Sequence, residues 1–232
     1  DIKFAFDECT PPFSTYDYVK AAVKSTHDWA KICIEEVNRS PIASRSGLFG
    51  IVQGSKYKDL REESARYINS LGFDGFGIGG DLGETKKDMP KILSWITPHL
   101  DEKKPRHMLG IGRLDDMENI VKSGMDLFDC TIPTHYGRRG IAFINAGLPA
   151  ESADLAERAG KLNLNKSTFL KDKKPLDDKC GCSVCQNYKR NYIAHLLKAK
   201  EITAMRLLTF HNLYFFNTFV ETLRQKIKNN QI

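Results

Sequence analysis

The sequence lacks the features that would place it in a membrane or outside the cell. No apolar run approaches the ~20 residues that span a bilayer. The opening stretch, DIKFAFDECT, has no basic segment followed by an apolar one, so it is not a signal peptide. Internal repeats and low-complexity tracts are absent as well. We therefore expect a globular, cytoplasmic protein that does not associate with a membrane.

An initiator methionine and a strong charge of one sign are also lacking. The first residues already have the pattern of a buried strand, which leads us to expect an upstream region. The formal net charge of the 232 residues is only +6. Such a bias permits a polyanionic partner but does not require one.

Cysteine is sparse, and half of it is concentrated in one place. Of six cysteines, three lie within the segment Cys180-Gly-Cys182-Ser-Val-Cys185. A secreted disulfide scaffold would distribute its cysteines differently in a much shorter chain, so the pattern indicates a reducing compartment and a metal site. Zinc takes four tetrahedral ligands, and either His195 or His211 can supply the fourth. The alternative is a group of free thiols or a redox pair.

Residues 1–145 alternate apolar strands with amphipathic helices. Strands are expected at residues 2–6, 47–52, 74–78, 106–111 and 127–132, with helices at 16–37, 60–71, 87–100 and 114–123. The strands are largely hydrophobic rather than alternating, which is typical of a parallel sheet buried on both faces. Strand–helix alternation predicts βαβ units, so both a (β/α)8 TIM barrel and an open doubly wound sheet are possible.

The residues that follow the strands favour the barrel. In a barrel all carboxyl ends of the strands converge on one mouth, where active sites lie. Polar residues or glycines follow each expected strand: Asp7, Gln53, Gly79, Gly80, Gly110 and Asp129. No GxGxxG leads directly into a helix, which weakens a Rossmann interpretation. Five strands cannot close such a barrel and about three more are needed, so we expect N-terminal strands that are absent from this chain.

We predict two domains. Residues 1–145 form the C-terminal portion of the barrel, and residues 146–232 form a zinc-binding subdomain with C-terminal helices. Residues 161–179 are rich in lysine, aspartate and asparagine and are expected to be a surface connection. Helices are predicted at residues 187–200 and 202–228.

Two carboxylates at strand ends are candidates for chemistry. Asp7 or Asp129 alone could cap the next loop or helix, but together at one barrel mouth they form a candidate pair of acid and nucleophile. Gln53 adds an amide, and Gly79-Gly80 exposes backbone N–H groups that larger side chains would block. A carboxylate, an amide and bare N–H groups match the edge of a purine.

A basic segment follows Asp129. It contains His135, Arg138 and Arg139. Arginines beside a nucleophile can hold phosphate oxygens. The alternative is a solvated basic loop without a ligand.

Several stretches together resemble one family in their order along the chain. They are FAFDECTP, GIVQGS, FDGFGIGG, LGIG and FDCTIPT, followed by Cys180, Cys182, Cys185 and His211. They look like the tRNA-guanine transglycosylases, and the resemblance covers essentially the whole chain. It implies a (β/α)8 barrel with a zinc subdomain. It also implies a pentosyltransferase of the queuosine pathway, which exchanges guanine at the wobble position of tRNAs with G-U-N anticodons for a 7-deazaguanine.

The resemblance also implies roles for residues. Asp129 matches the nucleophile that forms a covalent enzyme–RNA intermediate after the target base is flipped out. Asp7 and Gln53 match the guanine-reading side chains, and Gly80 offers a backbone N–H. The full expected set is Asp7, Gln53, Gly79, Gly80 and Gly110 for the base, His135, Arg138 and Arg139 for RNA, and Cys180, Cys182, Cys185 and His211 for one structural zinc ion.

The sequence departs from the family pattern in several places. The second catalytic aspartate of the family lies in a Ser-Gly-Gly-Phe-Gln motif that this chain does not contain. His135 stands where an arginine is usual, and Arg139 where asparagine is common. The loop from Gly80 to Glu84 is one residue short, although Glu84 resembles the glutamate that supports an aminomethyl base.

Two further functions stay open. The chain could be an inactive fragment or a non-catalytic, zinc-containing partner subunit, but such paralogues often lose the nucleophile, and Asp129 is retained. An unrelated barrel enzyme with a zinc ribbon is the third possibility. Family members often form homodimers through the zinc-bearing region, so we expect a homodimer.

Overall fold

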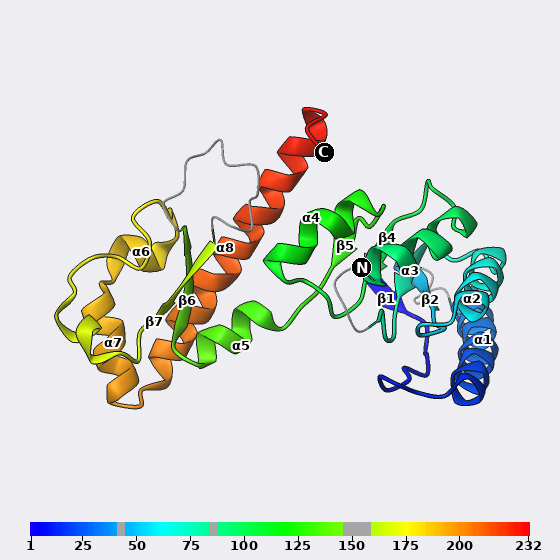
Figure 1. Ribbon diagram of the computed structural model, residues 1–232, viewed down its shortest axis with the longest axis horizontal. Helices are drawn as coiled ribbons and strands as arrows, with labels where there is room; N and C mark the ends of the chain where they lie inside the picture. Colours follow the sequence, from blue (N-terminus) through cyan, green and yellow to red (C-terminus); the bar gives the residue numbers. More distant parts are fainter. Residues whose placement is uncertain (41–44, 84–87, 146–158) are drawn as a thin grey trace. The chain divides into compact units, whose positions relative to one another are not determined.

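The structure is a computed structural model that describes residues 1–40, 45–83, 88–145 and 159–232 (Figure 1). The chain forms two compact units, Asp1–Ile111 with Asn119–Asp129, and Gly112–Glu118 with Cys130–Ile232. Glu84 lies outside the described residues, and the domain boundary expected after residue 145 stays a prediction.

A five-stranded parallel sheet organises the first unit. Its strands are β1 (Ile2–Phe4), β2 (Gly47–Val52), β3 (Gly75–Ile78), β4 (Arg106–Met108) and β5 (Leu127–Phe128). Each strand pairs with the next one in sequence, in the order β1-β2-β3-β4-β5. A doubly wound sheet reverses this order at a switch point, whereas a barrel does not. The α/β fold with a segment of a (β/α) barrel is therefore confirmed.

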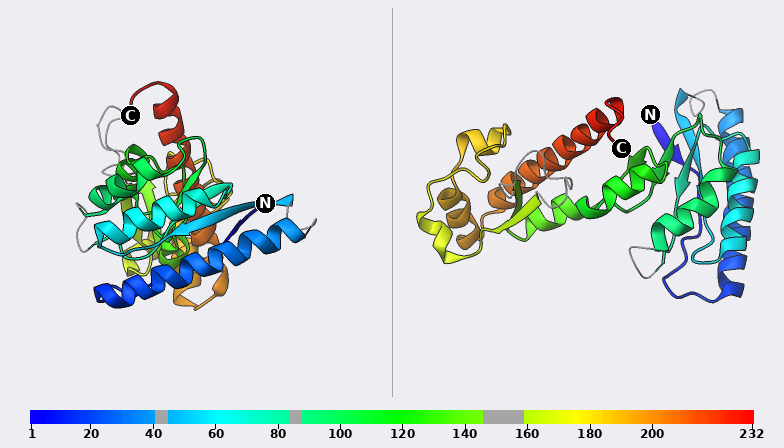
Figure 2. Two further views of the ribbon diagram at one scale, coloured as in Figure 1. Left: turned by 90° about the vertical axis from the view of Figure 1, so that its right-hand side faces the viewer. Right: turned by 45° about the horizontal axis from the view of Figure 1, so that its top comes forward.

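Helices α1 (Tyr16–Arg39), α2 (Lys58–Ser70) and α3 (Asp88–Ile96) follow the first three strands, and α4 (Leu114–Lys122) follows β4. Helices α1 and α2 lie side by side along the sheet (Figure 2). The core between them is almost entirely aliphatic and aromatic. Its fully buried members include Val52, Ile68, Phe73, Phe76, Ile78, Ile92 and Leu93.

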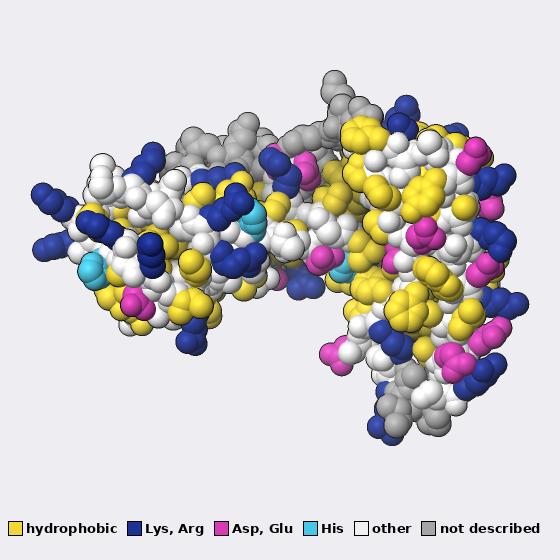
Figure 3. All heavy atoms as spheres, turned by 90° about the horizontal axis from the view of Figure 1, so that it is seen from below, with side chains coloured by type: hydrophobic (Ala, Val, Ile, Leu, Met, Phe, Trp, Pro, Cys, Tyr) yellow, Lys and Arg dark blue, Asp and Glu magenta, His cyan; other side chains and the backbone are white. Residues whose placement is uncertain are grey.

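The helical periodicity of residues 16–37 predicts one shared face for Val19, Val23, Trp29, Ile32 and Cys33. In the structure Val19 and Val23 are buried and Cys33 is half-buried, but Trp29 is 41% and Ile32 is 55% exposed. A helix turns by about 100° per residue, so Ile32 points away from the side that carries Val19. Exposed apolar side chains of the part that carries β1–β5 are visible in Figure 3.

The imidazole of His27 is one polar group in the core of the first unit. It is 8% exposed, its Nε2 lies 3.2 Å from Ser64 Oγ, and its ring stacks on Tyr67. Burial lowers the pKa of His27 to about 4, against a small opposing effect of Asp28. Between this pH and 6.5 the unfolded chain binds a proton that the folded chain does not.

We therefore predict an acid-dependent loss of stability that depends on His27. The lowered pKa of His27 contributes on the order of 3 kcal/mol to the free energy of unfolding. This contribution is fully present above pH 6.5 and is lost as the pH falls toward 4. Chemical denaturation across this range measures it. The His27→Asn variant is expected to lose less stability on acidification than the wild type. The exposed His195 provides the control variant His195→Asn, and an unchanged acid dependence in His27→Asn would contradict the assignment.

The second unit is built around the long helix α8 (Ile202–Lys228). Against it lie α5 (Ile132–Arg138), α6 (Ser183–Asn187), α7 (Arg190–Lys198) and the antiparallel pair of β6 (Ile141–Asn145) and β7 (Ala159–Asn163). Within α8 the buried Asn212 accepts a hydrogen bond from Phe143 N at 2.9 Å. Its amide nitrogen donates to Pro133 O and Ile141 O, each at 3.0 Å. One side chain thus fastens α8 to both α5 and β6.

Several elements of this unit were not predicted, among them α5 and β7. The basic segment after Asp129 forms α5 instead of a loop, because Gly137 lets the helix approach Thr209 of α8 closely. Part of the expected surface connection forms β7, because the backbone of β6 offers it a complete set of partners. Among the described residues, no helix is long and apolar enough to cross a membrane.

Candidate active site and metal centre

The first unit brings the predicted base-binding residues to one edge of its sheet. Gln53 follows β2 directly, Gly79 follows β3, and Asp129 follows β5. Gly110 comes two residues after β4 and Asp7 three residues after β1. All five strands are parallel, so these residues lie at the carboxyl edge, as the barrel interpretation required.

Asp7 and Gln53 are in direct contact. Gln53 Nε2 donates to Asp7 Oδ2 at 2.6 Å. The orientation of the amide follows from this partner, because a carboxylate accepts and does not donate. Gln53 is 1% exposed, and within the described part of the chain its Oε1 has no hydrogen-bond partner. A buried acceptor without a donor is costly, and this oxygen is left unsatisfied by the described residues.

The Gly79-Gly80 turn packs against the same amide. A Cβ at Gly79 would lie 2.7 Å from Gln53 Nε2, and one at Gly80 would collide with Gln53 Oε1. Gly80 also has φ of +76°, a conformation that favours glycine. Among the hydrogen bonds of the described residues, none uses the Gly80 N–H. The turn therefore presents a free donor beside the free acceptor of Gln53.

Asp129 is held by two donors from the neighbouring strand end. Its Oδ1 lies 2.9 Å from His107 Nε2 and 3.0 Å from Gly110 N. Its side chain remains 59% exposed, whereas that of His107 is 15% exposed. The second carboxylate oxygen thus stays accessible for attack on a ligand.

The hydrogen bonds decide the ionisation of Asp129. Partial burial pushes its pKa up, but the hydrogen bonds from Gly110 N–H and His107 outweigh this and hold the pKa below its usual value. Hydrogen bonds to the charged form favour that form. Asp129 is therefore an ionised carboxylate throughout the neutral range, as a nucleophile requires.

The four predicted metal ligands of the second unit form one cluster. The ligand atoms of Cys180, Cys182, Cys185 and His211 all lie within 4.8 Å of one another. His211 Nδ1 is 3.7, 3.4 and 3.4 Å from the three sulfur atoms in that order. Tetrahedral bonds of about 2.3 Å to sulfur and 2.0 Å to nitrogen would separate such atoms by about 3.5 Å. The cluster can hold a metal ion, and His211 rather than His195 completes it.

The surroundings of His211 fix its tautomer. The imidazole is fully buried, and its Nε2 lies 2.7 Å from the carbonyl oxygen of Phe143. That carbonyl only accepts, so Nε2 carries the proton and Nδ1 turns its lone pair to the thiols. Burial lowers the pKa of His211 and raises that of Cys180 to about 11. A bound metal cation would favour the thiolate form of the cysteines over the thiol form in such a buried site.

Helix α5 carries the predicted RNA-binding residues. Arg138 and Arg139 are exposed at its carboxyl end, and His135 is half-buried on the preceding turn. His135 faces a cavity of about 460 Å³ within the second unit, which is lined by Arg113, Leu114, Asp115, Thr131, Ile132, His135, Tyr136, Phe143, Lys161 and Phe216. The three predicted residues therefore do not share one pocket.

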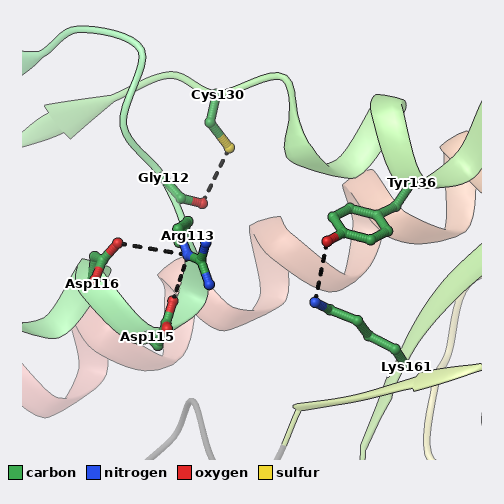
Figure 4. Close-up of polar contacts among 7 residues, drawn as sticks. All are labelled: Gly112, Arg113, Asp115, Asp116, Cys130, Tyr136 and Lys161. Atoms are coloured by element: carbon green, nitrogen blue, oxygen red, sulfur yellow. Dashed lines mark hydrogen bonds and ion pairs between the residues drawn. The ribbon is translucent and has the colours of Figure 1, made fainter. Parts of the chain in front are cut away.

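The polar contacts in and beside this cavity are shown in Figure 4. Lys161 Nζ lies 3.3 Å from Tyr136 Oη and 4.6 Å from the centre of its ring. Arg113 pairs with Asp115 at 3.2 Å and with Asp116 at 3.9 Å. Lys161 thus forms a cation–π contact with the Tyr136 ring.

Comparison with known proteins decides the family. A family model described as queuine tRNA-ribosyltransferase matches residues 1–232. The chain belongs to the queuine tRNA-ribosyltransferase family. A curated relative from Archaeoglobus fulgidus is 44% identical over 227 residues, which cover 98% of this chain and 54% of that protein. Queuine tRNA-ribosyltransferases of Bacillus velezensis and Bacillus subtilis are 40% and 41% identical over 233 residues, which cover 100% of this chain and 57% of each relative.

The chain thus spans about half the length of the curated relatives it matches. The resemblance inferred from the sequence is confirmed at the level of the family. The roles of individual residues of this queuine tRNA-ribosyltransferase family member rest on the geometry described above.

Sequence reasoning missed His107 as a member of the candidate active site. A lone histidine within a short strand carries no motif, and its contact with Asp129 depends on the register in which His107 pairs with Leu127. The only signal was its place three residues before Gly110, at the strand end next to that of Asp129. We assign His107 the role of orienting the carboxylate.

We predict that His107→Ala slows formation of a covalent adduct by about 10- to 100-fold, because a hydrogen bond to a charged group contributes about 1.5–3 kcal/mol. His107→Gln retains an N–H donor and is expected to lose less. Single-turnover rates at saturating RNA measure the effect. His99→Ala, at an exposed contact with Arg66, serves as control, and an unchanged rate in His107→Ala would remove His107 from the site.

Proposed function

We propose that this protein is a tRNA-guanine transglycosylase. It exchanges guanine at the wobble position of tRNAs with G-U-N anticodons for a 7-deazaguanine. The proposal is supported chiefly by two features at the carboxyl ends of the parallel strands. Asp129 is ionised and accessible, and among the described residues Gln53 Oε1 and the Gly80 N–H have no hydrogen-bond partner. Family membership supports the same reaction. We place the activity in the cytoplasm.

Base recognition is assigned to groups at the ends of β1 to β3. Guanine offers N–H donors at N1 and N2 and an acceptor at O6. The free Oε1 of Gln53 and the carboxylate of Asp7 accept from the N–H groups. The unused N–H of Gly80 donates to O6. Within this proposal, the amide nitrogen of Gln53 holds Asp7 in place.

The chemistry is assigned to Asp129. Its carboxylate oxygen attacks C1′ of the flipped nucleotide, a C–O bond forms, and the C–N bond to guanine breaks with its electron pair leaving on the base. A proton that enters at the leaving nitrogen neutralises the guanine. In the second half the incoming base gives up the proton of its attacking nitrogen to solvent, this nitrogen bonds to C1′, and the Asp129 carboxylate leaves. The proton released here balances the one taken up by guanine. His107 and Gly110 stabilise the carboxylate before attack and after release.

The metal ion is proposed to be zinc with a structural role. Three thiolates and one imidazole fill a tetrahedral shell and leave no position for water. The residues would clamp the loop around Cys182 to α8 through His211. No chemical step passes through this site.

RNA contacts are proposed for His135, Arg138 and Arg139. The two arginines are exposed at the end of α5, where guanidinium groups can pair with phosphate oxygens. A homodimer is also part of the proposal. It is supported by the stacked tyrosines of the zinc-bearing unit, Tyr188 and Tyr192, which remain 37% and 43% exposed.

A non-catalytic partner subunit is the second candidate. The retained nucleophile and the unpaired base-reading groups favour the enzyme, because a subunit without a base ligand would have no use for a buried Oε1 that lacks a donor.

Steady-state kinetics test the proposed function. A covalent intermediate that releases guanine before the second base enters gives parallel lines in double-reciprocal plots when tRNA and base are varied together. Converging lines would contradict the covalent route. No exchange under any condition, with tRNA still bound, would favour the partner subunit.

A further inference from the structure

The buried guanidinium of Arg61 is the most unusual charged group of the first unit. Arg61 lies in the first turn of α2 and is completely inaccessible to solvent. Burial lowers its pKa to about 10, opposed by the charges of Asp81 and Cys9, so the side chain stays protonated at neutral pH. A buried charge is costly unless it is fully hydrogen-bonded.

Its hydrogen bonds go to backbone carbonyls on two loops. Nε donates to Ser55 O at 2.7 Å, and Nη1 donates to Val52 O at 3.2 Å. On the second loop, Nη1 donates to Gly79 O and Nη2 to Asp81 O, each at 2.8 Å. The planar guanidinium group thus joins the segment after β2, which begins with Gln53, to the Gly79-Gly80 turn after β3.

The contact with Gly79 O fixes the direction of the free donor. In a trans peptide the C=O and the following N–H point in opposite directions. The Gly79 carbonyl points at Arg61, so the Gly80 N–H points away from it. The charge of Arg61 also polarises this peptide, which makes its N–H a stronger donor.

The peptide before Gln53 is fixed in the same way. Its carbonyl, Val52 O, accepts from Arg61 and from Gly79 N, while its N–H donates to Ser64 Oγ at 3.1 Å. Both ends of the peptide are therefore held by α2 or β3. The direction in which the Gln53 side chain leaves the backbone depends on the same clamp.

We propose that Arg61 is the positioning residue of the purine subsite, which orients the Gly80 N–H toward O6 of the base and strengthens it as a donor. This inference rests on the proposed function. Arg61 touches neither base nor ribose and acts through the Gly79–Gly80 peptide. As guanine leaves with the electron pair of the broken bond, part of the negative charge resides on O6. A preorganised, polarised donor stabilises that charge.

The test compares guanine with 2-aminopurine, which lacks both the O6 acceptor and the N1–H donor. The ratio of the 2-aminopurine inhibition constant to the guanine KM therefore includes both contacts, and the change of this ratio between the wild type and an Arg61 variant reports the Gly80 contact. Arg61→Lys keeps the charge but cannot reach all four carbonyls. We expect this variant to lower the ratio about tenfold, which corresponds to 1.4 kcal/mol, while the KM for tRNA changes less than about threefold.

Arg190→Lys is the matched control. Arg190 is also largely buried and donates to Asp172 at 3.0 Å and to Leu176 O at 2.9 Å, in the zinc-bearing unit. The Arg190→Lys variant should lower the stability of the protein without changing the ratio of the 2-aminopurine inhibition constant to the guanine KM. Equal weakening of both purines in Arg61→Lys would overturn the proposal, since a packing role affects them alike. A wild type that binds neither purine would contradict the proposed function instead.

A measurement on the wild type covers the case in which Arg61 variants do not fold. The amide proton of Gly80 is expected to shift downfield in NMR spectra when guanine is added, and not when 2-aminopurine is added. The same shift with both purines, or with neither while guanine binds, would overturn the proposal.

Discussion

Replacement of Asp129 with asparagine is expected to abolish the covalent RNA adduct and to lower base exchange by about 10⁴-fold or more. Loss of a nucleophile typically costs this much. The amide can still accept from Gly110 N at the same place, so the fold and the metal content should not change. Denaturing gel electrophoresis with a labelled anticodon stem-loop detects the adduct, and exchange of labelled guanine measures the rate.

Asp28→Asn is the control for this prediction. Asp28 lies on α1 of the same unit, is exposed, and pairs with Lys24 at 2.6 Å. A charge removed there should leave both readouts unchanged. An adduct that still forms with Asp129→Asn would mean that another residue is the nucleophile.

Replacement of Cys182 with serine is expected to remove the metal ion and to loosen the second unit. Cys182 is 1% exposed, its sulfur lies 3.4 Å from His211 Nδ1, and it caps α6 by accepting from Cys185 N. Structural zinc ions contribute about 10 kcal/mol or more to small folds. Metal analysis should fall from one ion per chain to almost none. Hydrogen exchange should accelerate in α6 and β6 but not in β2 and β3.

Cys33→Ser separates loss of the metal from loss of a partly buried thiol. Cys33 packs against the core of the first unit and is not one of the four residues of the metal-ligand cluster. This variant should keep its metal ion. Full metal occupancy in Cys182→Ser would remove that residue from the ligand set.

The sequence was most informative where local spacing determines the chemistry. Three cysteines within six residues necessarily lie close together in space, so the metal-binding loop could be recognised without knowledge of the fold. The partner His211 needed the resemblance, because 26 residues separate it from Cys185 and only the packing of α8 brings it back. The strand order and the place of Asp129 followed from hydrophobic runs that end in polar residues.

Other parts of the site depend on packing that no motif encodes. Arg61 reads as an ordinary surface arginine in a helical pattern, and only the two turns beside it make it a buried clamp. The hydrogen bond from the amide nitrogen of Gln53 to Asp7 depends on the pairing of β1 with β2. Helix α5 depends on the contact of Gly137 with α8, residues that lie far apart in sequence.

The central claim is that the purine subsite and Asp129 together exchange a tRNA base. The most direct measurement is incorporation of labelled guanine into unmodified tRNA with a G-U-N anticodon by the zinc-loaded, full-length protein. A tRNA whose wobble position carries adenine serves as the negative substrate. We predict that label enters only the first tRNA, at the wobble position, and that Asp129→Asn gives none. If the protein binds both zinc and tRNA but no label enters the tRNA, this result would contradict the account.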